Sequence, residues 1–442
     1  MSIPFLLLLM DITLIASAAW FWSQERTALA VSVIGATAVV GFWQWLLLGV
    51  TKSTGQPLRM SNGVRQPHYI QAMLQICLYV YWGLYWDGVA LFVPLILVQL
   101  VFAYAIDSVL SWTRYHEWRV GFGPVPIVLS INLFLWFREE HFYLQFVLIA
   151  LTYFCREFLH WTRGGRSTHI FNPSALSLTC VSAVLLMTNR LDLSRGVEII
   201  ESLTLPPNVF EVIFLLGIVV QLLYRTTLVT LGAVASQVLL FHVASYFAGA
   251  PISRLPIEVS VFLGLTLLVT DPSTSPRTSV GKLLFGMVYG TGTFLAFIAL
   301  RLVQQPSFVD KIWMVPIVNL MVPGFDRIGT TVSGWATGRN WMPVHRPGRF
   351  AWVAAYCSFF LLILTSFKNP VVQSQTLFPP PPAATATPKM LTVQLDNRKY
   401  CRESIPEPFE PFGFASEIAA YRRIREVYLF HGLAFRLSLL ER

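Results

Sequence analysis

Long blocks of apolar residues dominate this sequence and restrict the folds open to it. A helix needs about 20 mainly apolar residues to cross a bilayer, and many blocks here are close to that length. Only 12% of the 442 residues are charged, about half the share that is usual in a soluble protein. A transmembrane β-barrel would show shorter segments in which apolar and polar residues alternate. The sequence therefore predicts an all-α integral membrane protein.

The apolar blocks predict about 12–13 transmembrane helices. We place them at 3–22, 27–50, 69–86, 88–110, 120–137, 142–160, 173–188, 209–224, 228–248, 257–270, 283–303, 312–324 and 350–367. The block at 3–22 has no basic leader, so we expect it to be a retained span and not a signal peptide. The blocks at 173–188, 257–270 and 312–324 are short, as is typical of half-helices that line a cavity.

Basic residues collect in alternate loops between the predicted helices. Lys52, Arg119, Arg163 and Arg277 represent one set of loops, whereas the loops between them carry acidic residues such as Glu139. Lys and Arg mark cytoplasmic loops. We therefore expect a multi-pass protein of the cell (inner) membrane with a cytoplasmic N-terminus. The net charge of +9 follows from this bias, and without a basic stripe interleaved with aromatic residues it predicts a lipid bilayer and no nucleic acid as partner.

The chain divides into five predicted parts. Residues 1–119 form the N-terminal helices, 120–330 a transmembrane core, and 331–368 a loop and the last transmembrane helix. Residues 369–390 are a Pro/Ala-rich linker, whose composition favours a stiff spacer. Residues 391–442 carry apolar side chains at helical spacing, which predicts an amphipathic extension on the membrane or on a partner.

The sequence contains no pattern of cysteines or histidines that is typical of a redox metal site. The five cysteines are scattered without a CxxC pair, so we expect neither an iron–sulfur cluster nor another metal centre. His242 lies deep in a predicted helix without a facing histidine, and we expect no haem.

Two segments combine a helix break with polar side chains at a membrane boundary. Asn172-Pro173-Ser174 lies in RSTHIFNPSALSL, and Asp271-Pro272-Ser273 lies in LLVTDPSTSPRTSVGKLLFG. Proline disfavours helix in the residue before it, and the free N–H groups at a helix start bind anionic or polar groups. Paired breaks in two halves of a membrane protein point to a site between them. Simple helix capping accounts for the same residues and remains an alternative.

The same segments resemble a family of membrane flavoproteins. GRSTHIFNPSALSL is similar to that family's G-x-x-H-x-FNPA segment, and LLVTDPSTSPRTSVGKLLFGMVYG to its ATDPxSxPxTxxGxxxFGxxxG segment. WMVPIVNLMVPGFDRI resembles a third stretch that ends in N-x-x-x-P-x-x-D. The family comprises the NqrB protein of the sodium-pumping NADH:quinone oxidoreductase and the RnfD protein of the Rnf complex, and the resemblance covers residues 120–330.

The resemblance implies two inverted repeats of five helices with a flavin bound at or between them. Such subunits pass electrons within a larger assembly and can couple this to sodium or proton movement. The residues that match the three segments, with polar neighbours that we assign to cofactor binding, are Thr168, His169, Asn172, Pro173, Ser174, Asp271, Pro272, Ser273, Thr274, Arg277, Thr278, Lys282, Asn319 and Asp326. A basic side chain such as Arg277 or Lys282 would favour a reduced, anionic flavin.

One feature of the family is missing from this sequence. The family attaches FMN covalently to the threonine of a D-x-x-[ST]-G-A-T motif between the first two segments. No such motif occurs there, and the nearest string, Ser333 to Thr337, contains an extra Trp335 and lies later. We therefore expect no covalent FMN, and expect riboflavin or FMN to be held noncovalently.

Three functions are compatible with the sequence. The leading hypothesis is an electron-transfer subunit that receives electrons from another subunit and passes them through flavin toward a quinone or a protein. The alternatives are an inverted-repeat transporter or channel, and a structural subunit of a membrane complex that kept the fold and lost the cofactor. No catalytic residue is assigned in any of them.

Overall fold

The computed structural model describes residues 3–367, apart from 56–58, 64–65, 164, 250–251, 254 and 339–347, together with 394–395 and 398–399. The chain divides into two units, Met1–Asn369 and Pro370–Arg442. In the second unit the described residues form β5 (Gln394–Leu395) and β6 (Arg398–Lys399), which pair antiparallel. The rest of the predicted linker and amphipathic extension lies outside the described residues.

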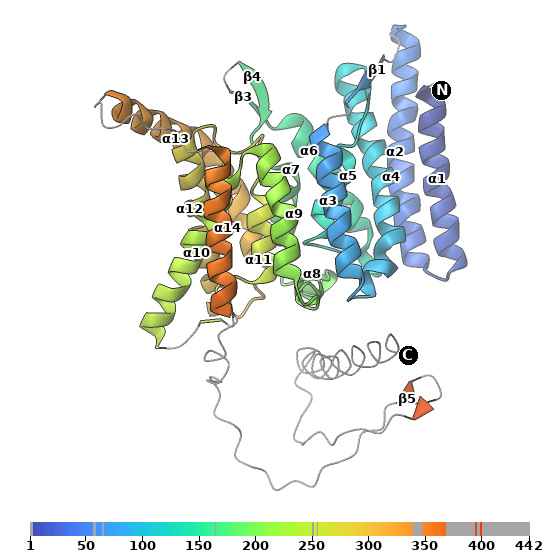
Figure 1. Cartoon of the computed structure of the whole chain (residues 1–442). Helices are drawn as coiled ribbons and strands as arrows, with labels where there is room; N and C mark the ends of the chain where they lie inside the picture. The colour runs from blue at the N-terminus through green and yellow to red at the C-terminus, as the bar shows by residue number, and fades with distance from the viewer. Residues whose placement is uncertain are drawn as a thin grey trace, which may run out of the picture. The chain divides into compact units, whose positions relative to one another are not determined.

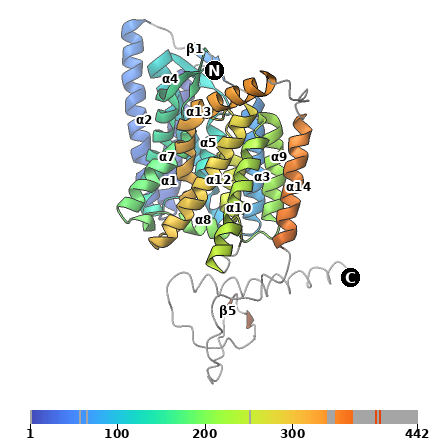
Figure 2. The ribbon, with the colours of Figure 1, turned by 90° about the vertical axis from the view of Figure 1, so that its left-hand side faces the viewer.

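The first unit is a bundle of α-helices (Figure 1). Its N-terminal half contains α1 (Ile3–Ser23), α2 (Thr27–Thr54), α3 (Gln66–Gly83), α4 (Gly88–Tyr115), α5 (Pro124–Asn132) and α6 (Tyr143–Phe158). The remaining helices are α7 (Pro173–Met187), α8 (Gly196–Ser202), α9 (Val209–Tyr224), α10 (Thr227–Ala248), α11 (Val259–Leu263), α12 (Ser279–Leu302), α13 (Asp310–Gly338) and α14 (Arg349–Phe367). Short helical turns occur at η1 (Glu139–His141) and η2 (Leu191–Leu193), and a π-helical segment, η3 (Gly264–Leu268), follows α11. Figure 2 shows the same bundle from the side.

Five of the described helices are long and apolar enough to cross a membrane. They lie at Leu6–Ser23, Thr27–Thr54, Gly88–Tyr115, Thr227–Ala248 and Ser279–Leu302. Shorter apolar helices occupy Pro173–Met187, Val209–Tyr224, Val259–Leu268 and Phe350–Ile363. Outward-facing side chains of α1 and α2 are largely apolar, including Trp20, Val39 and Trp45, as expected for contact with lipid. The protein is an all-α, multi-pass membrane protein, as the sequence predicts.

Most helices begin and end within a few residues of the predicted spans, but two differ. The predicted span 120–137 contains only the nine-residue α5, which ends at Asn132. Further along the same span, Phe137 forms an isolated β-bridge with Ser194. The predicted short span 312–324 belongs to α13, which has 29 residues. Its second half carries Asp326 and Arg327, which ended the apolar block in the sequence without ending the helix.

Two small β-sheets lie at the end of the bundle that also holds the N-terminus (Figure 1). Strand β1 (Arg59–Asn62) pairs in parallel with β2 (Glu117–Val120). Strand β3 (His160–Arg163) pairs antiparallel with β4 (Arg166–His169), so that His160 lies opposite His169. These strands are not predicted by the apolar blocks of the sequence. The polar start of RSTHIFNPSALSL, Arg166 to His169, forms strand β4.

Glycines allow the helices of the C-terminal half to pack closely. Helix α10 packs against α12, and α12 packs against α13. A Cβ atom at Gly286 would collide with the backbone of Val229, and one at Gly290 with the backbone of Ala233. Small residues at helix interfaces let backbones approach in this way within membranes. The packing holds the starts of α10 and α12 together, and both starts contribute to the candidate site.

Candidate functional site

Asn172 connects three elements at the start of α7. Its Oδ1 accepts a hydrogen bond from the backbone N–H of Ala175 at 3.3 Å, which caps the helix. Its Nδ2 donates to the carbonyl oxygen of Leu268 at the end of η3 at 3.0 Å. Its backbone N–H donates to Oδ1 of Asn319 on α13, also at 3.0 Å. The Asn-Pro-Ser triplet therefore caps a helix and also fixes that helix start to η3 and α13.

Asp271 organises the turn between η3 and α12. Its Oδ1 accepts hydrogen bonds from the backbone N–H and the hydroxyl of Ser273, at 2.9 and 2.7 Å. Its Oδ2 accepts from the Thr274 hydroxyl at 3.3 Å, and its carbonyl oxygen accepts from the Ser275 hydroxyl at 2.7 Å. Such a ring of local hydrogen bonds is what Asp supplies in a turn that proline has opened. Asn319 Nδ2 extends the network by donating to the Thr274 carbonyl at 3.3 Å.

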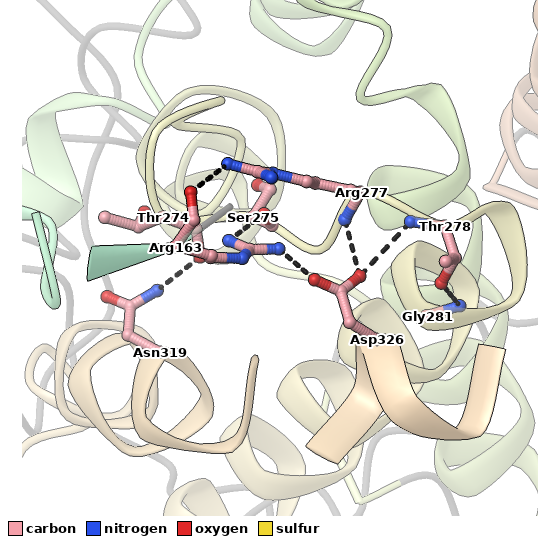
Figure 3. A network of polar contacts seen from close by, with 8 residues as sticks. All are labelled: Arg163, Thr274, Ser275, Arg277, Thr278, Gly281, Asn319 and Asp326. Carbon is pink, nitrogen blue, oxygen red and sulfur yellow. Dashed lines mark hydrogen bonds and ion pairs between the residues drawn. The ribbon is translucent and has the colours of Figure 1, made fainter. Parts of the chain in front are cut away.

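Asp326 joins α13 to both the β3–β4 hairpin and the start of α12 (Figure 3). Its Oδ1 accepts from the backbone N–H groups of Arg277 and Thr278, at 2.7 and 3.2 Å. Its Oδ2 forms an ion pair with Arg163. Arg163 also donates to the Ser275 carbonyl at 3.1 Å, and Arg277 donates to the Arg163 carbonyl at 2.9 Å. One carboxylate thus orders the segment that leads into α12.

Thr278 and two glycines complete the start of α12. Thr278 Oγ1 accepts from the backbone N–H of Gly281 at 3.1 Å and so caps the helix. A Cβ atom at Gly281 would lie 2.9 Å from the Phe325 carbonyl oxygen, and one at Gly329 would collide with the Thr278 side chain. Thr278 and Gly281 are positions of the second resemblance motif. In this structure they permit close contact between α12 and α13.

A polar cavity of about 260 Å³ opens beside this network. Its lining residues are Arg163, Thr168, Tyr224, Thr226, Pro272, Ser273, Ser275, Pro276, Arg277 and Lys282. Arg277 donates to the backbone carbonyl of Arg163, and Lys282 donates to that of Arg225. Among the described residues, neither side chain forms an ion pair with a carboxylate. We call this cavity the basic pocket.

Two hydroxyl groups of the basic pocket lack a hydrogen-bond partner among the described residues. These are Thr168 Oγ1 and Thr226 Oγ1, both buried atoms. Thr226 is 0% exposed and occupies the N-cap position of the 22-residue helix α10, without a side-chain cap bond. Buried polar groups in proteins are normally hydrogen-bonded. The free hydroxyls, the positive end of α10 and the basic side chains together form a site suited to a polar, anionic group.

His169 borders the site without lining the basic pocket. Its ring lies 4.6 Å from that of His160 on the paired strand, measured between centroids, and its Nδ1 has no partner among the described residues. Burial lowers the pKa of His169 from 6.5 to about 4, although Asp271 acts in the opposite direction. The imidazole is therefore neutral at pH 7 and contributes no positive charge to the pocket.

Most of the predicted site residues either line the basic pocket or hold the segments that line it, whereas His169, Pro173 and Ser174 do neither. Those that line the basic pocket are Thr168, Pro272, Ser273, Arg277 and Lys282. Asn172, Asp271, Thr274, Thr278, Asn319 and Asp326 lie behind them and hold the lining segments through the bonds given above. Pro173 is the first residue of α7, and Ser174 is buried with its carbonyl accepting from Ser177.

Three residues of the basic pocket carry no sequence motif, namely Arg163, Tyr224 and Thr226. Arg163 lies in a predicted loop, where it contributes only to the charge pattern. Tyr224 is the last residue of α9, and Arg225 and Thr226 connect it to Thr227, the first residue of α10. The YRTT string at this junction places a ring, a guanidinium and two hydroxyls where two apolar helices meet, and that composition is the available signal. Among the described residues, no group of three or more His, Cys, Asp and Glu side chains gathers as a metal site.

The fold and site thus define a multi-pass helical membrane protein with a basic pocket at one end of its bundle. No known protein-family model matches the sequence, and a search of curated proteins likewise found no match.

Proposed function

We propose that this protein is an electron-transfer subunit of a membrane redox complex that binds a flavin noncovalently at the basic pocket. The observation that carries the proposal is the convergence of the three separate sequence segments around one cavity. Asn172, Asp271 and Asn319 come from different elements, yet each supports a wall of the same site. A bound flavin would supply electron transfer, because its ring accepts and releases electrons one or two at a time.

The chemistry of the basic pocket fits the ribityl-phosphate end of FMN better than the ring. Thr168 and Thr226 offer free hydroxyls, and Arg277 and Lys282 offer positive charge for phosphate oxygens. Among the described lining residues Tyr224 alone carries an aromatic ring, so it is the candidate to stack on isoalloxazine. The volume of about 260 Å³ is slightly below the range of about 300–1,000 Å³ for small-molecule sites. We therefore expect the pocket to hold one end of the cofactor.

Titration of FMN with the purified protein tests this assignment. Binding is followed by the quenching of flavin fluorescence in mild detergent. Thr226→Val keeps the side-chain shape and removes the free hydroxyl, so we expect about tenfold weaker FMN binding, since a hydrogen bond to a charged group contributes about 1.5–3 kcal/mol. Thr331→Val on an exposed part of α13, where the hydroxyl bonds only its own helix, is the matched control. Equal FMN affinity in both variants, or no binding by the native chain, contradicts the proposal.

The orientation and partners belong to the same proposal. Arg163, Arg277 and Lys282 line the basic pocket, and Arg163 belongs to β3. Figure 1 shows β3 at the end of the bundle that also holds β1 and the N-terminus. Positive residues favour the cytoplasmic side, so we place this end and the N-terminus in the cytoplasm of a cell with an inner membrane. Electrons would arrive from another redox subunit and leave toward a quinone or a protein partner. A reporter fused to the N-terminus that is active only outside the cytoplasm would overturn this orientation.

A transporter is the second candidate, because one helix is too short to cross a membrane and another is irregular. Helix α5 has nine residues, and α11 has five before it continues as η3. Interrupted helices of this kind line substrate sites in transporters. Purified protein that is stabilised by a solute and carries no flavin would favour this function over electron transfer.

A further inference from the structure

Three arginines and two carboxylates lie together where α4, β2 and α6 meet. The Glu157 carboxylate on α6 lies 3.7 Å from Arg114 Nη1 and 3.4 Å from Arg119 Nη1. Arg156 Nη1 lies 3.1 Å from Asp107 Oδ1. We call these five residues the arginine cluster. Among the described residues, no other carboxylate forms an ion pair with the three arginines, so the cluster carries one positive charge in excess.

The neighbouring groups do not remove this excess charge. Glu117 on β2 lies opposite Arg59 in the β1–β2 register, so these two charges offset each other. Burial lowers the pKa of His160 on β3, although Glu157 acts in the opposite direction, and the neutral ring adds no charge at pH 7. Within Met1–Asn369, the residues that the structure does not describe include no Asp or Glu in the sequence. No acid of this unit is therefore left out of the balance.

The positive groups of the arginine cluster are the accessible ones. The side chains of Arg114 and Arg119 are 39% and 31% exposed, whereas that of Glu157 is only 6% exposed. A molecule that approaches this surface therefore meets guanidinium groups and not the carboxylate between them. Guanidinium groups bind phosphate oxygens with good geometry. The cluster is thus open to an anion that carries a phosphate group.

An apolar surface on α6 begins directly beside the arginine cluster. Val147, Phe154 and Phe158 are exposed, and their spacing of seven and four residues places them on one face of the helix. We call these three residues the α6 stripe. The Arg114 guanidinium lies 5.2 Å from the centre of the Phe158 ring, and that ring lies 4.5 Å from the Phe154 ring. Charge and apolar surface therefore form one continuous surface.

We propose that the arginine cluster and the α6 stripe together bind one anionic phospholipid. Its phosphate lies on Arg114 and Arg119, and an acyl chain follows the α6 stripe. From Val147 to Phe158 the helix rises about 16 Å, close to half of the roughly 30 Å hydrocarbon core of a bilayer. A phosphodiester with one negative charge matches the single excess positive charge, whereas the choline of a zwitterionic lipid brings a further positive group to it.

The lipid site is separate from the proposed flavin function. None of the residues of the arginine cluster or the α6 stripe lines the basic pocket. Free inorganic phosphate has no use for the α6 stripe, so a contribution of Phe154 to binding distinguishes a lipid from a free anion. Absence of flavin from the purified protein would leave this proposal unaffected.

Thermal unfolding of the full chain in mild non-ionic detergent tests the site. The probe is phosphatidylglycerol, and the reference is phosphatidylcholine with the same acyl chains. A ligand that binds only the folded state raises Tm as its concentration rises, so we expect a saturable rise with phosphatidylglycerol beyond that with phosphatidylcholine. Arg119→Gln should weaken the apparent affinity for phosphatidylglycerol about fivefold. Phe154→Ala should weaken it about threefold or more, because it removes part of the apolar contact.

The exposed Arg190, which pairs with Asp192 on the surface, provides the control, and Arg190→Gln should keep the full response. Arg114→Gln should act like Arg119→Gln, and if it fails to fold, Arg119→Gln on the short strand β2 decides the question. Equal effects of the two lipids, or an unchanged response in Arg119→Gln, would overturn the proposal. A response that falls in Arg119→Gln, stays intact in Phe154→Ala and is reproduced by inorganic phosphate alone would identify a free-anion site and would also overturn it.

Discussion

Arg163 on β3 and Asp326 on α13 form an ion pair, although 163 positions separate them in the sequence. Their side chains are 14% and 20% exposed, so the pair is shielded from much of the solvent. The same carboxylate receives two backbone N–H groups from the segment before α12. This carboxylate therefore links the β3–β4 hairpin and the turn before α12 to α13, beside the basic pocket.

Neutralising Asp326 should loosen this wall. Asp326→Asn removes the charge that balances Arg163, and we expect it to lower the free energy of unfolding by about 2 kcal/mol. Asp192→Asn breaks the exposed pair with Arg190 and should change it by less than about 0.5 kcal/mol. Reversible unfolding in mild detergent measures both. Equal effects of the two substitutions would show that the Arg163–Asp326 pair contributes no more than a surface contact.

Asn172 should separate helix capping from the link to η3. Asn172→Asp keeps an acceptor for the Ala175 N–H but loses the donor to the Leu268 carbonyl, whereas Asn172→Ala loses both. Loss of an N-cap costs about 0.5–2 kcal/mol. We expect Asn172→Ala to be the less stable variant by about that amount in the same unfolding measurement. If Asn172→Asp proves as unstable as Asn172→Ala, the cap bond is not the main contribution.

Gly286 tests the close approach of α10 and α12. Gly286→Ala places a Cβ atom against the Val229 backbone, which cannot move without shifting α10. We expect a loss of about 2 kcal/mol or more, from overpacking. Gly35→Ala in α2, where no described atom lies within 4 Å of the added carbon, should be neutral or slightly stabilising, because Ala is the better helix former. A neutral Gly286→Ala variant would contradict this packing.

His169 should make stability depend on pH. Burial lowers its pKa from 6.5 to about 4 in the folded protein, so between these values the unfolded chain binds more protons. Stability therefore rises with pH through this window and falls as the pH drops from about 6.5 toward 4. His169→Gln should reduce the slope of stability against pH over that range. An identical slope in native protein and variant would show that other groups cause the dependence.

The apolar blocks predict the fold well because burial in lipid demands long helices, and lipid-facing residues such as Val39 and Trp45 carry that signal directly. The apolar blocks predict the helix ends wrongly where contacts between distant residues decide where a helix stops. Helix α13 continues through Asp326 and Arg327 because Asp326 finds partners on β3 and before α12, and no local pattern reveals this. Helix α5 ends at Asn132, although the apolar residues continue to Phe137, which instead forms an isolated β-bridge with Ser194.

The site residues could be predicted from the sequence only where a local pattern marks them. Asn172 and Asp271 are marked by the proline that follows each of them, which is a local signal. Thr226 contributes through its position opposite two segments that are distant in sequence, and only the fold places it there. The sequence patterns thus identify most of the supporting network and Thr168, and the fold adds the second free hydroxyl of the basic pocket, that of Thr226.

The visible absorption spectrum of the purified protein in mild detergent, recorded before and after acid precipitation, tests the central claim most directly. Noncovalent flavin binding predicts flavin absorption bands that move into the supernatant when the protein precipitates, and weaker bands in Thr226→Val protein than in Thr331→Val protein. Bands that stay with the precipitated protein would contradict the noncovalent assignment. A colourless protein that also fails to bind added FMN would contradict the flavin function itself.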